Sequence, residues 1–208
     1  MWITAAATLA GALIGLILNR NLAALSYRRP EETELALPRP AWWLIPTIAL
    51  AWGALTWRHQ YEAWPILVLW LPISAALGWL SAVDLDVRRL PDAVMLPTAG
   101  WVAAIITTDA VVAGDPTPAL ITTGIGLAAG IGAWILHFLS RGAFGFGDVK
   151  LIGLLSIPLA STSPYAVFPA LLIACGLAIG SSLAFRQRLL PFGPHLGLGY
   201  VALAVAAT

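Results

Sequence analysis

The strongest constraint on this chain is a succession of apolar segments separated by short polar connections. A transmembrane helix needs about 20 predominantly apolar residues. The segments expected to span a membrane are residues 2–25, 41–57, 64–83, 93–108, 118–139, 149–161, 165–185 and 194–207. The sequence therefore predicts an all-α fold, a polytopic transmembrane bundle of about eight helices.

The composition supports this class and limits the number of domains. Only 10% of the 208 residues are charged and 60% are hydrophobic, whereas soluble domains carry about 25% charged residues. The longest connection, residues 26–40, is expected to be a short solvated loop that is too small for a domain. Residues 1–208 are thus predicted to form a single integral membrane domain.

The basic residues are divided unequally between the two sets of connections. The connections after even-numbered spans hold only Arg58. The connections after odd-numbered spans hold Arg20, Arg28, Arg29, Arg39, Arg88, Arg89, Arg141, Lys150, Arg186 and Arg188. Basic residues accumulate on the cytoplasmic side, so both termini are expected outside. The first segment lacks the basic start of a signal peptide and is expected to be retained.

Four aspartates are expected on the cytoplasmic side: Asp84, Asp86, Asp92 and Asp148. A charge at membrane depth costs several kcal/mol, so aspartates at the ends of apolar segments need a reason. Asp84 is expected directly after the third span and Asp148 directly before the sixth. Two helix-end aspartates at similar depth are positioned to face each other.

Such a pair has a well-defined chemistry. Two close carboxylates cannot both ionise easily, so one keeps a proton. The ionised one takes a proton from the water that attacks a peptide carbonyl, and the protonated one donates to the carbonyl oxygen and later to the leaving nitrogen. This mechanism uses no metal and no cofactor, and neither is expected. Gly145 and Gly147 would let the backbone bend and a substrate strand approach.

Structural interpretations compete with this hypothesis. Asp148 is also placed where it could cap the start of the sixth helix, and Asp92 where it could cap the fourth. Asp86 is expected to be a solvated charge and Lys150 an interfacial cation. Accessory roles at the pair stay open for Asp86, Asp92 and Lys150. His195 is expected in a loop.

Other hydrolytic chemistries have weaker signals. The sequence contains no His-Glu-x-x-His zinc motif. Ser181 and Ser182 precede His195 but lack a third partner, which disfavours a serine mechanism.

Four stretches resemble the type IV prepilin peptidases: Gly11–Asn19 followed by Tyr27 and Arg28, Asp84–Asp92, Gly145–Leu151 and Pro191–Gly199. The resemblance implies a membrane aspartic endopeptidase of the Gly-x-Gly-Asp type, with Asp84 and Asp148 as the catalytic pair. It implies pilin-like precursors as substrates, cut after a short basic leader at the cytoplasmic face of a bacterial inner membrane. The leader precedes an apolar helix that stays in the bilayer. No nucleic-acid partner is expected.

One feature departs from many bacterial members of that family. They carry an insert after the first helix with paired Cys-x-x-Cys motifs, which is associated with N-methylation of the new N-terminus. Here the first loop is short, and the chain has one cysteine, Cys175, in an apolar segment. Peptidase activity is therefore expected without methyltransferase activity.

Two alternatives to a prepilin-type peptidase remain. A presenilin-like protease would share only the Gly-x-Gly-Asp stretch and would hold its other aspartate deep within a helix. A non-enzymatic proton-coupled carrier, or a membrane factor for pilus or secretion assembly, would use the aspartates to bind cations or partners. A carrier is expected to show acidic residues in mid-span, which this sequence lacks.

Overall fold

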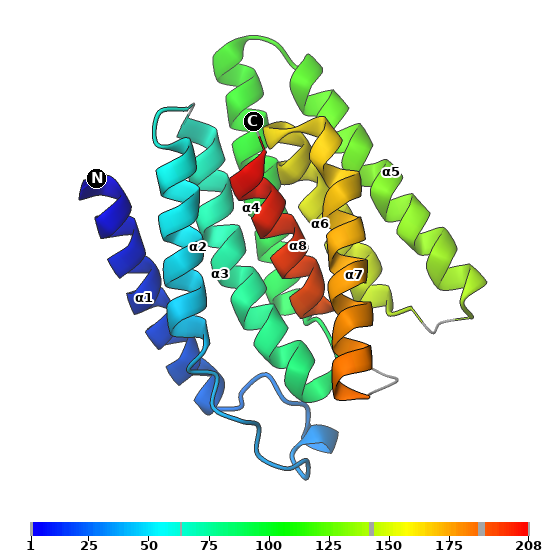
Figure 1. Cartoon of the computed structure of the whole chain (residues 1–208). Helices are drawn as coiled ribbons and strands as arrows, with labels where there is room; N and C mark the ends of the chain where they lie inside the picture. The colour runs from blue at the N-terminus through cyan, green and yellow to red at the C-terminus, as the bar shows by residue number, and fades with distance from the viewer. Residues whose placement is uncertain (1, 63, 142–143, 187–189, 208) are drawn as a thin grey trace.

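The computed structural model describes residues 2–62, 64–141, 144–186 and 190–207, which form a bundle of helices (Figure 1). In these ranges the α-helices are α1 (Trp2–Ala23), α2 (Leu44–His59), α3 (Trp64–Val87), α4 (Asp92–Ala113), α5 (Thr117–Leu139), α6 (Phe146–Thr162), α7 (Val167–Phe185) and α8 (Gly193–Ala206). Two 3-10 turns, η1 (Pro30–Glu32) and η2 (Pro164–Ala166), lie in connections. Each predicted span corresponds to one helix, so the predicted fold class is confirmed.

The predicted ends need correction chiefly at four helices. Helix α2 starts at Leu44 and not at residue 41, and α6 starts at Phe146 and not at residue 149, so Asp148 lies inside α6 and not directly before it. Helix α3 continues to Val87 and α4 to Ala113, because an aspartate such as Asp84 or Asp109 is tolerated inside a helix and does not end it. Five of the described helices are long and apolar enough to cross a membrane: α1, α3, α4, α5 and α7 with its preceding turn. The predicted cytoplasmic residue Arg188 lies outside the described residues.

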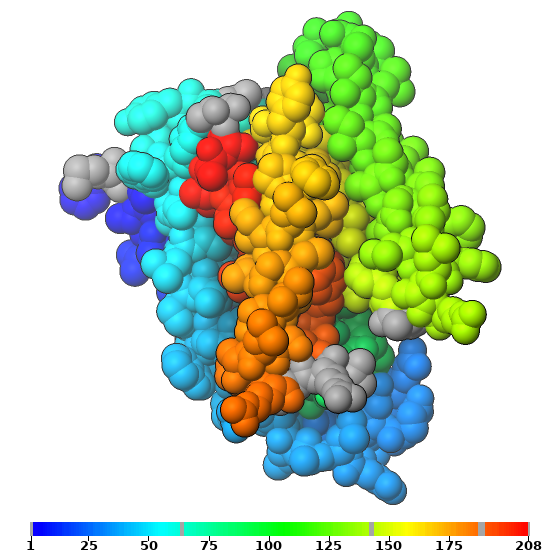
Figure 2. Space-filling model, turned by 45° about the vertical axis from the view of Figure 1, so that its right-hand side comes forward, coloured from blue at the N-terminus to red at the C-terminus, as the bar shows by residue number. Residues whose placement is uncertain are grey.

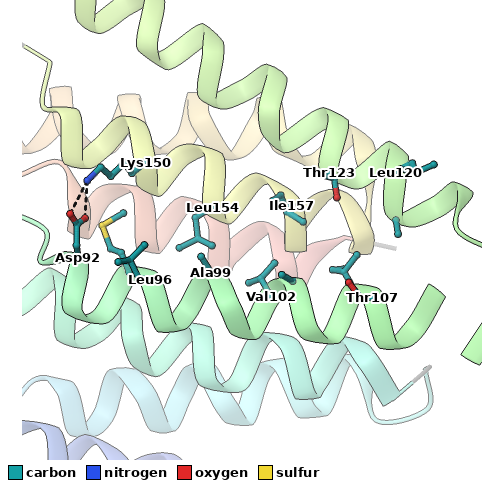
Figure 3. A pocket seen from close by; sticks show the side chains of 14 residues that line it. Asp92, Leu96, Ala99, Val102, Thr107, Leu120, Thr123, Lys150, Leu154 and Ile157 are labelled. Atoms are coloured by element: carbon teal, nitrogen blue, oxygen red, sulfur yellow. Dashed lines mark hydrogen bonds and ion pairs between the residues drawn. The ribbon is translucent and has the colours of Figure 1, made fainter. Parts of the chain in front are cut away.

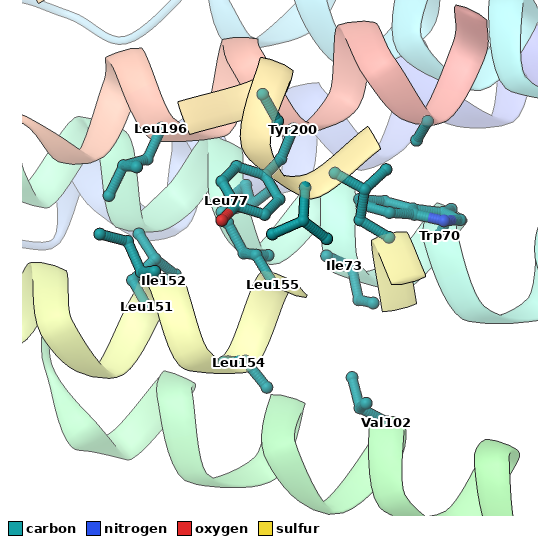
Figure 4. Close-up of a cluster of buried hydrophobic side chains, with 14 of the residues drawn as sticks. Trp70, Ile73, Leu77, Val102, Leu151, Ile152, Leu154, Leu155, Leu196 and Tyr200 are labelled. Carbon is teal, nitrogen blue, oxygen red and sulfur yellow. The ribbon is translucent and has the colours of Figure 1, made fainter. Parts of the chain in front are cut away.

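The shorter helices α6 and α8 lie at the centre of the bundle, packed against α3. Their contact is an apolar cluster that includes Trp70 and Ile73 of α3, Leu155 of α6, and Leu196 and Tyr200 of α8 (Figure 4). The buried Tyr200 hydroxyl is 2.9 Å from the Ser156 hydroxyl, so its polar atom is satisfied. Helices too short to span alone are tolerated where protein surrounds their ends.

The helix connections alternate between two ends of the bundle (Figure 1). The last residues of α1, α3, α5 and α7 and the first residues of α2, α4, α6 and α8 lie at one end, which we call the Asp84 end. In the space-filling view the α1–α2 connection covers much of that end (Figure 2). The opposite end, which we call the His59 end, holds the other three connections and both termini. There the buried His59 ring bonds to the Ala204 carbonyl at 2.7 Å and to Glu62 at 2.8 Å, which ties α2 to α8.

Helices α1 and α2 approach closely because glycine lies between them. A Cβ atom at Gly15 would lie 2.7 Å from the Leu44 carbonyl oxygen and 2.7 Å from the Ile45 Cα. Small residues stabilise helix pairs in lipid through close van der Waals packing. The neighbouring atoms are backbone, so they cannot move aside independently of α2.

Gly15→Ala is expected to destabilise the bundle by about 1–3 kcal/mol through overpacking. Gly132→Ala on α5 is the matched control, because no atom lies within 4 Å of its added Cβ. Alanine is a better helix former than glycine, so the control should be neutral or slightly stabilising. Thermal unfolding in detergent measures both, and equal midpoints would contradict the close-packing argument.

Candidate active site

A cavity of about 450 Å³ lies at the Asp84 end, between the α3–α4 turn and the start of α6. It is lined by Arg29, Asp84, the run 88–93, the run 145–148 and Lys150. Two stretches that are distant in the sequence, one around Asp84 and one around Asp148, thus face the same space. These are the stretches in which the sequence analysis placed its candidate pair.

Asp84 lies in the last turn of α3, not after the helix as predicted. Only 5% of the residue is exposed, and its Oδ2 accepts a 2.9 Å hydrogen bond from the backbone N–H of Gly193. Gly193 begins α8, where the first amides of a helix have no intrahelical partner. The donor is therefore supplied by a helix N-terminus, which also carries partial positive charge.

Gly193 leaves no room for a side chain. A Cβ atom there would lie 2.8 Å from Asp84 Oδ2 and 3.3 Å from Leu90 Cδ2. The absence of a side chain thus brings the α8 amide to the carboxylate. Gly193 lies in the family-like stretch Pro191–Gly199, but nothing in the sequence signals this role.

Asp148 lies in the first turn of α6, whose N-cap is Gly145 and which has no side-chain capping bond. The predicted role of Asp148 as N-cap is therefore wrong. The carboxylate is partly buried and receives no hydrogen bond from the described residues. It interacts electrostatically with Asp84 across the cavity.

The two glycines before Asp148 leave room for neighbouring side chains, because neither carries a Cβ atom. A Cβ at Gly145 would lie 2.7 Å from Asp148 Oδ2, and one at Gly147 would lie 3.3 Å from Leu90 Cβ. Gly145 has φ −65°, a conformation that any residue adopts, so its contribution is space for the carboxylate. Gly147 lets the start of α6 lie against the α3–α4 turn.

Residues 66–183 match the model of the type IV leader peptidase family. The match covers more than half of the chain and contains both Asp84 and Asp148. This chain belongs to the type IV leader peptidase family. No curated protein and no solved structure was found to match it. The protein is therefore a leader peptidase-type protease with several apolar helices suited to a membrane.

In this leader peptidase Asp86 does not face the cavity as a solvated charge, so that prediction is wrong. Its side chain is 7% exposed and accepts hydrogen bonds from Tyr27 Oη at 2.8 Å, Arg28 Nε at 2.9 Å and Arg28 Nη2 at 2.7 Å. Burial and the Asp86 bond raise the pKa of Tyr27 to about 12. The contacts fix the α1–α2 connection to the end of α3.

A second ion pair holds the same connection to the α3–α4 turn of the peptidase. Arg89 donates to both carboxylate oxygens of Glu32, at 2.7 and 2.8 Å, and also to the Tyr27 carbonyl. The Arg89 guanidinium lowers the pKa of Glu32 to about 2. The two ion pairs together keep the connection, including Arg29, beside the cavity.

Asp92 and Lys150 form a salt bridge at the rim of the cavity. Lys150 Nζ lies 2.8 and 3.0 Å from the two Asp92 oxygens and 5.2 Å from the centre of the Phe146 ring. The N-cap of α4 is Pro91, so the predicted capping role of Asp92 is wrong. Lys150, expected to extend towards the interface, instead joins α6 to α4.

His195 lies in the first turn of α8, not in a loop as predicted. Its ring bonds to the Ser181 hydroxyl and to the Pro191 carbonyl, each at 3.0 Å. The second ring nitrogen thus faces a backbone carbonyl, whereas a serine triad places a carboxylate there. The contacts connect α7 to the turn that carries Gly193. In the described residues no group of three or more His, Cys, Asp or Glu side chains is arranged to hold a metal ion.

Gly193→Ala is expected to lower peptidase activity by about 100-fold, because the added methyl displaces the Asp84 carboxylate and small misplacements are costly in catalysis. Gly180→Ala on α7 is the control, since its Cβ would meet no atom within 4 Å. Initial rates of precursor cleavage measure both variants. Full activity in Gly193→Ala would contradict the positioning role.

The Glu32–Arg89 pair predicts a pH dependence of stability. The pKa of the Glu32 carboxyl is about 2 in the folded protein, below its ordinary value of 4.5. The ion pair therefore stabilises the fold above pH 4.5, and this contribution is lost as the pH falls towards 2. The difference in Tm between the native protein and Glu32→Gln should be constant from pH 5 to 7 and shrink below pH 4.5. A difference that grows on acidification would refute the assignment.

Proposed function

We propose that the protein is an aspartic endopeptidase that removes the leader peptides of pilin-like precursors, with Asp84 and Asp148 as its catalytic pair. The observation that carries the proposal is that α3 and α6 each bring one aspartate to the same cavity at the Asp84 end. Membership in the leader peptidase family supports the general reaction. The pair supplies the groups that peptide hydrolysis needs.

The surroundings of the two carboxylates favour different roles. The Gly193 amide donates to Asp84 and so stabilises a carboxylate anion. Asp148 receives no such bond from the described residues, which suits a protonated acid. Asp84 then accepts a proton from water as the oxygen attacks the scissile carbonyl, and Asp148 donates its proton to the carbonyl oxygen.

Collapse of the tetrahedral intermediate completes the reaction. Because Asp148 has already given up its proton, the leaving nitrogen receives the proton now on Asp84, and not a proton from the initially protonated acid as expected from the sequence. The C–N bond breaks, and Asp148 recovers its proton from the gem-diol oxygen. The pair returns to its starting state with one proton shared between two acids. No covalent enzyme intermediate is formed.

The location of the cavity suits a precursor with a basic leader and an apolar helix. Scission at one end of the bundle would release the leader to water and leave the helix in the bilayer. The basic side chains Arg28, Arg29, Arg88, Arg89 and Lys150 lie at this end, whereas Arg58 lies at the other. This asymmetry supports a cavity that faces the cytoplasm across a bacterial inner membrane.

The α1–α2 connection supports a peptidase without methyltransferase activity. It is short, contains no cysteine, and is occupied by the ion pairs to Asp86 and Arg89. The family match is to leader peptidases, which gives no support to a carrier. Asp84 lies within one turn of the end of α3 and not deep within the helix, which does not favour a presenilin-like protease.

Asp84→Asn and Asp148→Asn are each expected to lower precursor cleavage by about 10²–10⁴-fold, because each removes one acid–base group. Asp109→Asn, at the His59 end of α4, is the matched control and should retain activity. Each variant is co-expressed with a pilin-like precursor, and mass spectrometry follows release of the leader. Cleavage that persists in either Asn variant removes that residue from the pair.

A further inference from the structure

An apolar groove of about 630 Å³ runs along the bundle between α4 on one side and α5 and α6 on the other (Figure 3). Its floor includes the buried side chains of Met95, Val102 and Leu154. Its rims carry Leu96 and Leu120, which are 69% and 70% exposed. Large apolar side chains are thus left uncovered along a hollow of the bundle.

The groove extends over most of the depth of a bilayer. It begins at Asp92 and reaches Thr107 on the same helix (Figure 3). Fifteen helical residues cover roughly 22 Å, compared with about 30 Å for the hydrocarbon core. The alanines Ala99 and Ala103 line the α4 wall, so a neighbouring helix could approach it closely.

The groove adjoins the cavity that holds the two aspartates. Asp92 and Lys150 line both, and their salt bridge joins α4 to α6 at the place where the two spaces meet. A polypeptide whose scissile bond lies between Asp84 and Asp148 therefore has an apolar path directly beside it. That path runs from the Asp84 end towards the His59 end.

We propose that this groove binds the apolar helix of the precursor, with the residues after the scissile bond lying along α4. The proposal rests on the proposed function and adds the surface that recognises the retained part of the substrate. The segment enters as a helix, because backbone amides and carbonyls in lipid must be bonded within the segment. One apolar stripe of that helix covers Leu96, Ala103 and Leu120.

The occupant follows from the placement of the reaction. The product of cleavage keeps an apolar helix whose first residue starts at the cavity, and the groove starts at the same point. Both α4 and the bound helix would run from the Asp84 end to the His59 end. Ala103 lies about 16 Å along α4 from Asp92, so it should contact the substrate about 11 residues beyond the scissile bond.

Two neighbouring alanines on α4 provide a matched test. Ala103 lines the groove, whereas the exposed Ala104 does not. Each is changed to cysteine in a protein in which Cys175→Ser removes the native thiol and Asp84→Asn keeps the precursor intact. The probe is a pilin-like precursor with a single cysteine in its apolar helix about 11 residues after the scissile bond. Disulfide formation with copper phenanthroline is read on a gel.

A crosslink at Ala103→Cys and little at Ala104→Cys is the expected result. No crosslink at Ala103→Cys, or equal crosslinks at both positions, would overturn the proposal. The probe cysteine stays in the apolar helix whether or not the leader is removed, so this readout does not depend on Asp84 and Asp148 being the catalytic pair. Failure of the proposed function would instead appear as cleavage that persists in the Asn variants.

A second pair of variants measures the effect on the reaction. Ala103→Trp fills the groove and should raise the KM for the membrane precursor at least about tenfold with kcat little changed, as for loss of ground-state binding. Ala104→Trp should leave both constants unchanged. Unchanged cleavage by Ala103→Trp would mean that the groove holds only lipid, and a drop in kcat alone would mean a distorted catalytic site; either result contradicts docking.

Discussion

A carboxylate withdrawn from water at the edge of a membrane bundle depends on the hydrogen-bond donors around it. Among the residues that the structure describes, Asp84 has one such donor, the backbone amide of Gly193. This bond requires that α8 begin beside the last turn of α3, which in turn requires the tight packing of Leu196 and Tyr200 into the α3–α6 core. The central apolar cluster and the candidate site are therefore parts of one arrangement, in which a short helix is held by its neighbours and directs its amide end at an acid.

The acidic residues at the Asp84 end fall into two groups that differ in their bonding partners. Asp86 and Glu32 are each bonded to arginine and fix the first connection to the α3–α4 turn. Asp84 and Asp148 have no such cationic partner among the described residues and face the cavity. The structure thus separates the acids that are bonded to arginine from the two acids that line the cavity, although Asp84 and Asp86 are only two residues apart. Residues two positions apart on an α-helix lie about 200° apart around its axis, so the two carboxylates point to different sides.

Much of the architecture was predictable, because the length of an apolar segment can be read directly from consecutive residues. The helices and the grouping of basic residues at one end follow from segments that a reader can mark along the sequence. Helix ends were less certain, since α3 and α4 continue beyond their apolar runs. The pairings Arg28–Asp86, Arg89–Glu32 and Lys150–Asp92 join residues far apart in the chain, and no spacing rule signals them. The sequence marked Gly193 only as a member of the stretch Pro191–Gly199, which resembles the family. Its role depends on its distance to Asp84, and tertiary packing alone determines that distance.

The donor to Asp84 is carried by the last helix, beyond the region 66–183 that defines the family match. During synthesis both aspartates emerge from the ribosome before α8 does. A nascent chain that already contains α3 and α6 still lacks the amide that orients the first acid. Assembly of the proposed proteolytic centre would consequently be coupled to the synthesis and insertion of α8, which would keep a half-inserted chain from cutting the membrane proteins being made beside it.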